Sequence, residues 1–176
     1  MNELLQALEN DNLVKMKELL DTGIDLNKPV IIGEEYELDE PDETNLLFYA
    51  IRTYASLEAI ELLLEYGVDI YTYDENGVST LDTAIKFKRH DIIELCIEKG
   101  YDLNESKRKS GIKPLMLTSC FGDIKTAQLL IDKGADINDT DNSGMSPKDY
   151  ARKLGQKKFE EFLTGLGGEY SAYRNS

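Results

Sequence analysis

The stretch "LIDKGADIN" (130–138) decides the fold, because the chain repeats it in three close variants. The variants are "LLDTGIDLN" (19–27), "LLEYGVDIY" (63–71) and "CIEKGYDLN" (96–104). Each copy has an apolar pair, two mostly polar residues, a glycine, a variable residue, an aspartate and another apolar residue. The four shared glycines are Gly23, Gly67, Gly100 and Gly134.

The spacing of these glycines predicts an array of stacked units. The last three follow one another at 33 and 34 residues, and a fixed period in the low thirties is typical of a solenoid. The first spacing is 44 residues, one period plus an insertion of about eleven. The excess lies in "PVIIGEEYELDEPDE" (29–43), which has no counterpart at the other junctions.

Apolar residues at helical spacing predict a helix ahead of each glycine, as at Ile124, Ala127, Leu130 and Ile131. Glycine follows because the residue past a helix end often adopts a positive φ, which costs glycine least. A short polar residue that can cap free amides begins this helix in three units, and the other unit has an arginine there. These four positions are Asn12, Ser56, Asp123 and Arg89.

In each full unit, a shorter helix comes before the helix that leads to the glycine. Its starts are "NLLFYA" (45–50), "STLDTA" (79–84), "KPLMLT" (113–118) and "SPKDYA" (146–151). Serine is expected at the N-cap in two of them, and proline in the first turn, where it is tolerated. The residues are Ser79, Ser146, Pro114 and Pro147. The pattern predicts an all-α chain of helical hairpins in a row.

These residues carry a resemblance to the ankyrin-repeat family. "GIKPLMLTSCFGDIKTAQLLIDKGADIN" (111–138) resembles a nearly intact ankyrin unit. The resemblance implies an all-α ankyrin-repeat solenoid of stacked helix-turn-helix units with short hairpin loops. The histidine of the family's tetrapeptide is replaced in every unit, which implies less regular polar bonding between units. The replacing residues are Phe48, Asp82, Met116 and Asp149.

We expect one domain over residues 1–166. Its units are 2–27, 28–71 with the acidic insertion 29–43, 72–104, 105–138 and a cap at 139–164. The remaining residues, 167–176, are glycine-rich and lack an apolar period, so a flexible C-terminal tail is expected.

Composition narrows the classes of partner. The chain has 41% hydrophobic and 31% charged residues, values typical of a folded soluble protein. Its net charge is −14, and residues 1–80 hold 19 acidic and 4 basic side chains. Such a surface repels nucleic acid and anionic membrane and favours a basic protein partner, although acidity can also serve solubility alone. We expect no nucleic acid and no membrane as partners.

The same composition argues against cofactors and export. No apolar run approaches the roughly 18 residues of a membrane span, and the first ten residues lack a basic region before an apolar stretch, so a cytoplasmic location is expected. Cys96 occupies an apolar position of its unit and is expected in the core, whereas Cys120 falls elsewhere in its unit. With His90 as the one histidine, we expect neither a metal nor another cofactor.

Ankyrin domains, as the resemblance implies, are overwhelmingly protein-binding scaffolds that use hairpin tips and the first helix on a concave side. Apolar residues at some of these positions suggest a contact patch; alternatively, the two phenylalanines tuck between helices. Transferred position by position, the binding residues are Glu75, Asn76, Val78, Lys86, Phe87, Lys109, Ser110, Ile112, Cys120, Phe121, Asn142, Ser143 and Met145.

The insertion is the second candidate binding segment. Seven of the eleven residues of "GEEYELDEPDE" (33–43) are acidic, a density that suits docking on clusters of Lys and Arg. A solvated loop without a partner is the alternative. The residues assigned to binding are Glu34, Glu35, Tyr36, Glu37, Asp39 and Glu40.

The remaining features of the sequence give weaker evidence of function. The basic runs 86–90 and 107–109 are expected to pair with the acidic insertion or to be exposed to solvent. No recognisable catalytic motif is present in the sequence. Asp82 and Asp149 could pair as acid and base, but any acidic protein offers such pairs. The sequence predicts a monomeric, non-catalytic module that binds a protein with a basic surface on its concave face, acting as an inhibitor or immunity protein against a basic toxin or enzyme. An assembly scaffold, an effector or a carboxylate-dependent enzyme are the alternatives.

Overall fold

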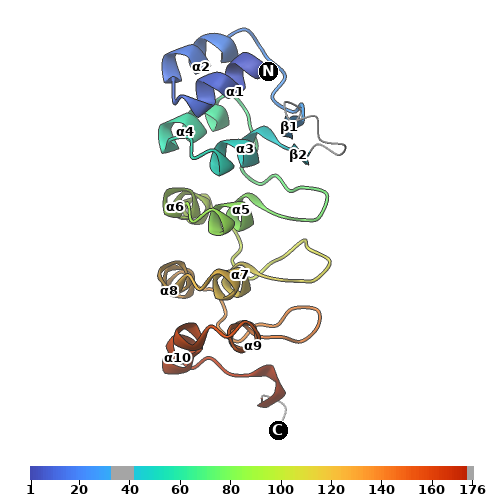
Figure 1. Ribbon diagram of the computed structural model, residues 1–176, viewed down its shortest axis with the longest axis vertical. Coiled ribbons are helices and arrows are strands. Elements are labelled where there is room, and N and C mark those ends of the chain that lie inside the picture. The colour runs from blue at the N-terminus through green and yellow to red at the C-terminus, as the bar shows by residue number, and fades with distance from the viewer. Residues whose placement is uncertain (33–41, 174–176) are drawn as a thin grey trace. The chain divides into compact units, whose positions relative to one another are not determined.

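The computed structural model describes residues 1–32 and 42–173. By their internal contacts they form two compact units, Met1–Asp74 and Glu75–Ser176. Both units are built from antiparallel helix pairs, five pairs in the part of the chain that is described (Figure 1). The predicted all-α repeat architecture is confirmed.

The first unit contains two helix pairs and one strand pair. Its elements are α1 (Asn2–Glu9), α2 (Leu13–Leu20), β1 (Val30–Ile32), β2 (Asp42–Thr44), α3 (Leu46–Arg52) and α4 (Leu57–Glu65). The strands are antiparallel, with Val30 opposite Thr44 and Ile32 opposite Asp42. They were not expected from the sequence.

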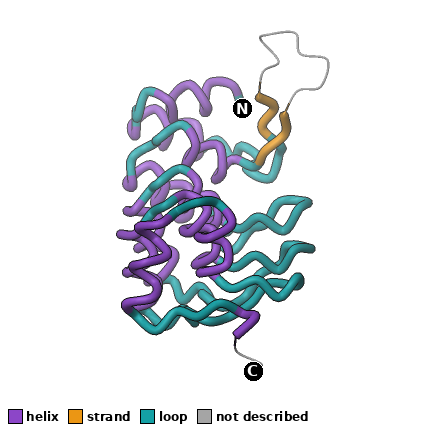
Figure 2. The backbone as a smooth tube through the Cα atoms, turned by 60° about the horizontal axis from the view of Figure 1, so that its bottom comes forward, coloured by secondary structure: helices purple, strands orange, loops and turns teal. Residues whose placement is uncertain are grey.

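The second unit contains three helix pairs in a row. Its elements are α5 (Thr80–Lys86), α6 (His90–Glu98), α7 (Pro114–Phe121), α8 (Ile124–Asp132), α9 (Pro147–Lys153), α10 (Lys157–Gly165) and the short 3₁₀ helix η2 (Ser171–Tyr173). Within this unit α7 packs on both α5 and α9. The three loops that precede these helices project on the same side and run side by side (Figure 2).

The expected helix ends are confirmed. The side chains of Asn12, Ser56 and Asp123 each accept a hydrogen bond from the backbone N–H three residues on, and Arg89 makes no such cap. Ser79 and Ser146 form capping boxes with the aspartate at the third helical position. Pro114 and Pro147 begin their helices, and the four repeat glycines have positive φ.

The turn between the two helices of a pair always contains one left-handed residue. Glycine fills this position only in the last two pairs, so the first three pairs hold a side chain in a conformation that L-residues rarely adopt. From first pair to last, the residues are Asp11, Tyr54, Lys88, Gly122 and Gly155, with φ of 51°, 59°, 54°, 63° and 68°.

An aliphatic core lies between the helices of each unit. Leu4, Leu8 and Met16 are fully buried in the first unit, and Leu81 and Ile92 in the second. The expectation for Cys96 is confirmed, because its side chain has no exposed surface.

The C-terminal tail makes hydrogen bonds to the last repeats over its described part. Glu169 N–H donates to the Asn138 side chain at 2.8 Å, and Asn138 in turn donates to the Gly167 carbonyl at 3.1 Å. Asn104 makes the same two bonds to Gly134 and Asp136 one unit earlier. Residues 167–169 therefore occupy the place of a further repeat's glycine turn and cap the array.

Candidate functional site

Two loops of the second unit, those before α7 and α9, are joined by hydrogen bonds. The backbone N–H of Asn142 donates to the Ser110 carbonyl at 3.0 Å, and its side chain donates to the Lys109 carbonyl at 2.8 Å. Gly111 lies against this contact, and a Cβ at its position would come within 2.9 Å of the Asn142 nitrogen. The loop before α7 is therefore held by the loop before α9 as well as by its own turn.

The first two loops approach each other closely at Gly77. Gly77 has φ of +76°, and a Cβ added there would overlap the Lys107 carbonyl and lie 2.8 Å from the Arg108 nitrogen. Gly144, the equivalent residue of the third loop, has φ of +82° and nothing within 4 Å of such a Cβ. Glycine is thus needed in the first two loops for close approach as well as for φ.

We call the tips of these loops (75–78, 107–112, 141–145) together with α5, its C-cap Phe87, α7 and α9 the loop face. The predicted binding residues of the second unit all lie on it and all retain accessible surface. Exposed ones are Glu75, Asn76, Lys86, Lys109, Ser110, Phe121, Asn142 and Ser143, and partly buried ones are Val78, Phe87, Ile112, Cys120 and Met145.

The two phenylalanines differ from each other. Phe121, the last residue of α7, is 38% exposed. Phe87, just past the end of α5, is half-buried, and the Lys86 ammonium lies 5.6 Å from its ring centroid. Of the two, Phe121 has more apolar surface to offer a partner.

Between the first two repeats of this unit lies an ion pair. Arg108 Nε donates to Asp82 at 3.0 Å, and Asp82 also accepts from the Ser79 N–H. Burial raises the pKa of the Asp82 carboxyl, although Arg108 and Ser79 act in the opposite direction. Asp82 occupies the place of the family's histidine, so at this position a polar side chain bonds two neighbouring repeats.

The sequence predicts that the basic runs pair with the acidic insertion or are exposed to solvent. Two of their arginines instead pair with carboxylates of the second unit. Arg108 pairs with Asp82, and buried Arg89 pairs with Asp91 at 2.7 Å. The Arg89 guanidinium lowers the pKa of Asp91. Both arginines stabilise the second unit, Arg89 within one repeat and Arg108 between two neighbouring repeats.

Asp82 and Asp149, the two carboxylates that could pair as acid and base, both make structural hydrogen bonds. Asp149 accepts hydrogen bonds from the Ser146 N–H at 2.8 Å and the Ser171 N–H at 3.0 Å. Burial works to raise the pKa of Asp149, but these hydrogen bonds outweigh it and hold the pKa below its ordinary value. Asp149 thus joins α9 to the tail, as Asp82 joins two repeats.

The acidic insertion is described only at its base. Asp42 and Glu43 lie in β2, and Arg52 of α3 pairs with Asp42 at 3.2 Å. The predicted binding residues of the insertion lie outside the described residues: Glu34, Glu35, Tyr36, Glu37, Asp39 and Glu40.

Among the described residues, no group of three or more His, Cys, Asp or Glu side chains is placed to hold a metal ion. Both cysteines are free thiols, and burial raises the pKa of Cys96 to about 12. No described helix is long and apolar enough to cross a membrane.

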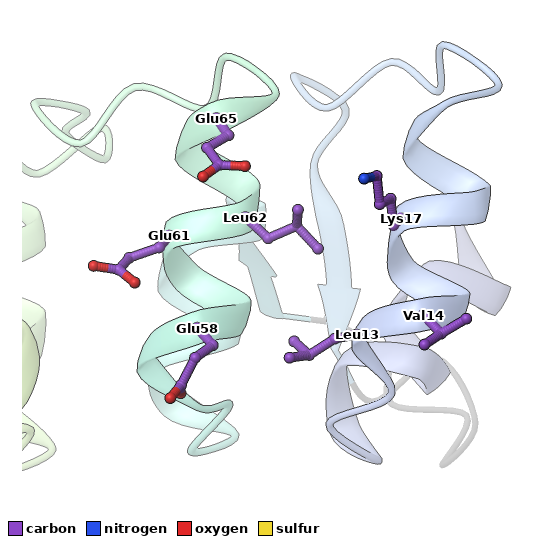
Figure 3. Close-up of a pocket in the computed structure, with 7 residues that line it drawn as sticks. All are labelled: Leu13, Val14, Lys17, Glu58, Glu61, Leu62 and Glu65. Atoms are coloured by element: carbon purple, nitrogen blue, oxygen red, sulfur yellow. The ribbon is translucent and has the colours of Figure 1, made fainter.

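A groove on the first unit was missed by the sequence analysis. It lies between α2 and α4, has a volume of about 390 Å³, and is drawn in Figure 3. A signal was present: Glu58, Glu61 and Glu65 follow one another at three and four residues, so they share a helix face. Its lining residues are Leu13, Val14, Lys17, Glu58, Glu61, Leu62 and Glu65.

Helix pairs, glycine turns and a row of loops together define a repeat protein of the helix-turn-helix class. The family described as ankyrin repeats matches residues 4–107 and 81–172, so the chain belongs to the ankyrin-repeat family. Ankyrin repeats generally mediate protein–protein interactions.

Relatives of this chain include proteins of several kinds. It is 35% identical over 127 residues to an ankyrin repeat protein of Rickettsia felis, covering 70% of this chain and 33% of that protein. It is 28% identical over 160 residues to an L-asparaginase of Dirofilaria immitis, covering 91% of this chain and 25% of that protein. It is 32% identical over 107 residues to the E3 ubiquitin-protein ligase Ufd4 of Drosophila melanogaster, covering 61% and 4%. The chain thus spans a third or less of each of these relatives.

Proposed function

We propose that this protein binds a partner protein through the loop face, and that the acidic insertion favours a partner with a basic surface. The observation that carries the proposal is the close contact of neighbouring loops, by hydrogen bonds at Asn142 and by backbone approach at Gly77. Because neighbouring loops fix one another, little conformational entropy is lost when they meet a partner, and pre-organisation of this kind raises affinity. Phe121 adds an exposed aromatic side chain, a residue type enriched at interface hot spots.

The charge of the chain supports a basic partner. Residues 1–74 hold 18 of the 34 acidic and 4 of the 20 basic side chains, so the whole formal charge of −14 falls on the first unit. Such a field speeds the approach of a cation-rich protein and slows that of nucleic acid. Within this class, inhibition of a basic toxin or enzyme is the role we favour over a scaffold or an effector.

Site-specific photo-crosslinking in extract of the source organism tests the loop face. A crosslinker replaces Glu75 or Lys109 at the loop tips, and matched controls carry it at Glu94 of α6 or Lys125 of α8, which are also exposed. We expect the same protein to be captured from both loop positions and from neither control. Capture from all four positions alike, or from none, would refute the loop face as the binding surface.

The captured partner then tests the role of the insertion. Replacing its seven acids by Asn or Gln should leave the melting temperature unchanged and weaken binding most at low salt, where charges are least screened. Unchanged affinity at low salt would remove the insertion from the mechanism. If the partner is a toxin or enzyme, its activity in the presence of saturating protein decides between inhibition and scaffolding.

A further inference from the structure

The groove between α2 and α4 has an apolar floor that the fold leaves open. Leu13 and Leu62 extend into the space between the two helices from opposite sides, and Lys17 lies on the same side of α2 (Figure 3). Val14 is 73% exposed, although it is a β-branched apolar residue at the start of a helix. An open apolar strip of this kind gains free energy when another apolar surface covers it.

The α4 side of the groove carries a row of negative charge. Glu58, Glu61 and Glu65 all line it, and none of them forms an ion pair with a described residue. Lys17 is the one cation among the lining residues, and it stands on the α2 side. The groove therefore offers apolar contact with three acidic residues along its α4 side, of which Glu61 extends away from α2 (Figure 3).

The dimensions of the groove suit a short helix. Its lining runs from Leu13 to Lys17 on α2 and from Glu58 to Glu65 on α4, so the walls are about 6 and 10 Å long at 1.5 Å per residue. One to two turns of a helix fit along it. Side chains spaced three and four apart on such a helix match the spacing of the three glutamates.

We propose that this groove binds an amphipathic helix of a partner protein, with its apolar stripe on Leu13 and Leu62 and its Lys or Arg residues facing α4. Charge complementarity selects the occupant: an acidic helix would meet three like charges, and an anionic lipid surface would be repelled in the same way. The contact is much smaller than a standard interface of about 1,600 Å², so binding in the micromolar range is expected. This surface lies on the first unit and is separate from the loop face.

Two designed peptides serve as probes. Both have 14 residues and the same stripe of Leu at helical spacing, and one carries Lys on the flank where its twin carries Glu. We expect the full-length chain to bind the lysine peptide in fluorescence anisotropy and to bind the glutamate peptide at least about tenfold more weakly at low salt. Equal binding of the two peptides, or no binding of the lysine peptide at about 1 mM, overturns the proposal.

Charge-matched variants separate the groove from the general negative field of the unit. The variant E58Q/E61Q/E65Q should bind the lysine peptide about tenfold more weakly, because each exposed glutamate–lysine pair contributes a modest gain in binding free energy. The control E3Q/D25N/D69N removes the same net charge elsewhere on the unit and should change binding by less than about twofold. Equal weakening by both variants would show non-specific attraction and overturn the groove.

Val14 offers a second, independent pair. The V14K and V14E variants both place a long polar side chain at an exposed helical position, so folding should be retained in both. The V14K variant should bind the lysine peptide about fivefold more weakly, and the V14E variant should bind it equally or more tightly. The same sign for both variants overturns the proposal. Neither variant touches the loop face, so partner capture at Glu75 and Lys109 stays intact whichever way the groove test falls.

Discussion

Replacing Gly77 by alanine tests whether the loops of the second unit really support one another. The equivalent glycine of the third loop, Gly144, has the same sign of φ but no neighbour, and is a matched control. Alanine at φ near +80° costs about 1–2 kcal/mol in local strain, partly offset because alanine restricts the unfolded chain by about 0.4–1 kcal/mol. The G144A variant should therefore lose about 1 kcal/mol of unfolding free energy.

The G77A variant carries the same strain and a steric term in addition. Its Cβ would overlap the Lys107 carbonyl and come within 2.8 Å of the Arg108 nitrogen. Both are backbone atoms, which cannot rotate away, so the two loops have to separate. Overpacking of this kind typically costs about 1–3 kcal/mol. The expected loss is about 2–4 kcal/mol, clearly more than in the control.

Urea unfolding of the full-length chain measures the difference, and amide hydrogen exchange shows where it acts. Exchange should accelerate in α5 and α7 of the G77A variant, and the G144A variant should affect α9 alone. If the two variants lose the same free energy, the loops do not abut and the pre-organised loop face has no physical basis. A binding loss in G77A that greatly exceeds that in G144A would support the role of loop support in recognition.

Three further changes probe single features. Phe121→Ala should lower the melting temperature by less than about 5 °C, since the ring is exposed, yet weaken partner capture; a larger drop in thermal scans would assign the ring to the core. Lys88→Gly should raise the free energy of unfolding by up to about 1 kcal/mol in urea titrations, because an exposed side chain at φ of +54° is strained; a loss would contradict this conformation. Asp149 has a lowered pKa, so its stabilisation is present above its unfolded pKa of about 3.9 and disappears as the pH falls through the folded value. Asp149→Asn should therefore lose less stability than the parent chain between pH 6 and pH 3 in urea titrations, and parallel pH profiles would exclude the bonding described here.

The sequence predicted the helices and their ends because those features are encoded locally. A cap such as Ser56 needs only the amide three residues on, and a glycine such as Gly134 responds to φ at a single position. The close approach of Gly77 to Lys107 is different, since the two lie 30 positions apart and only the stacking of repeats brings them together. The same holds for the pair of Asp82 and Arg108.

The tail shows a signal that was available and overlooked. Gly167 follows Gly134 by 33 residues, one more period, and an acidic residue follows it two positions later as in the earlier copies. The glycine-rich composition of the tail concealed this agreement. Leu163, four residues ahead of Gly167, is fully buried just as Leu130 is ahead of Gly134. A search for the period alone, without regard to composition, would have extended the array to residue 169.

Because the two units differ in net charge, binding to their surfaces should depend on salt concentration to different extents. The second unit has as many basic as acidic residues, so recognition by the loop face depends on shape and on the rigidity of its loops, which salt affects little. The first unit carries the whole net charge, so contacts through its insertion or its groove weaken as salt rises. The salt dependence of binding to a given partner therefore reports which unit does the binding. A partner whose affinity falls steeply with salt engages residues 1–74, and one whose affinity is nearly constant engages the loop face alone.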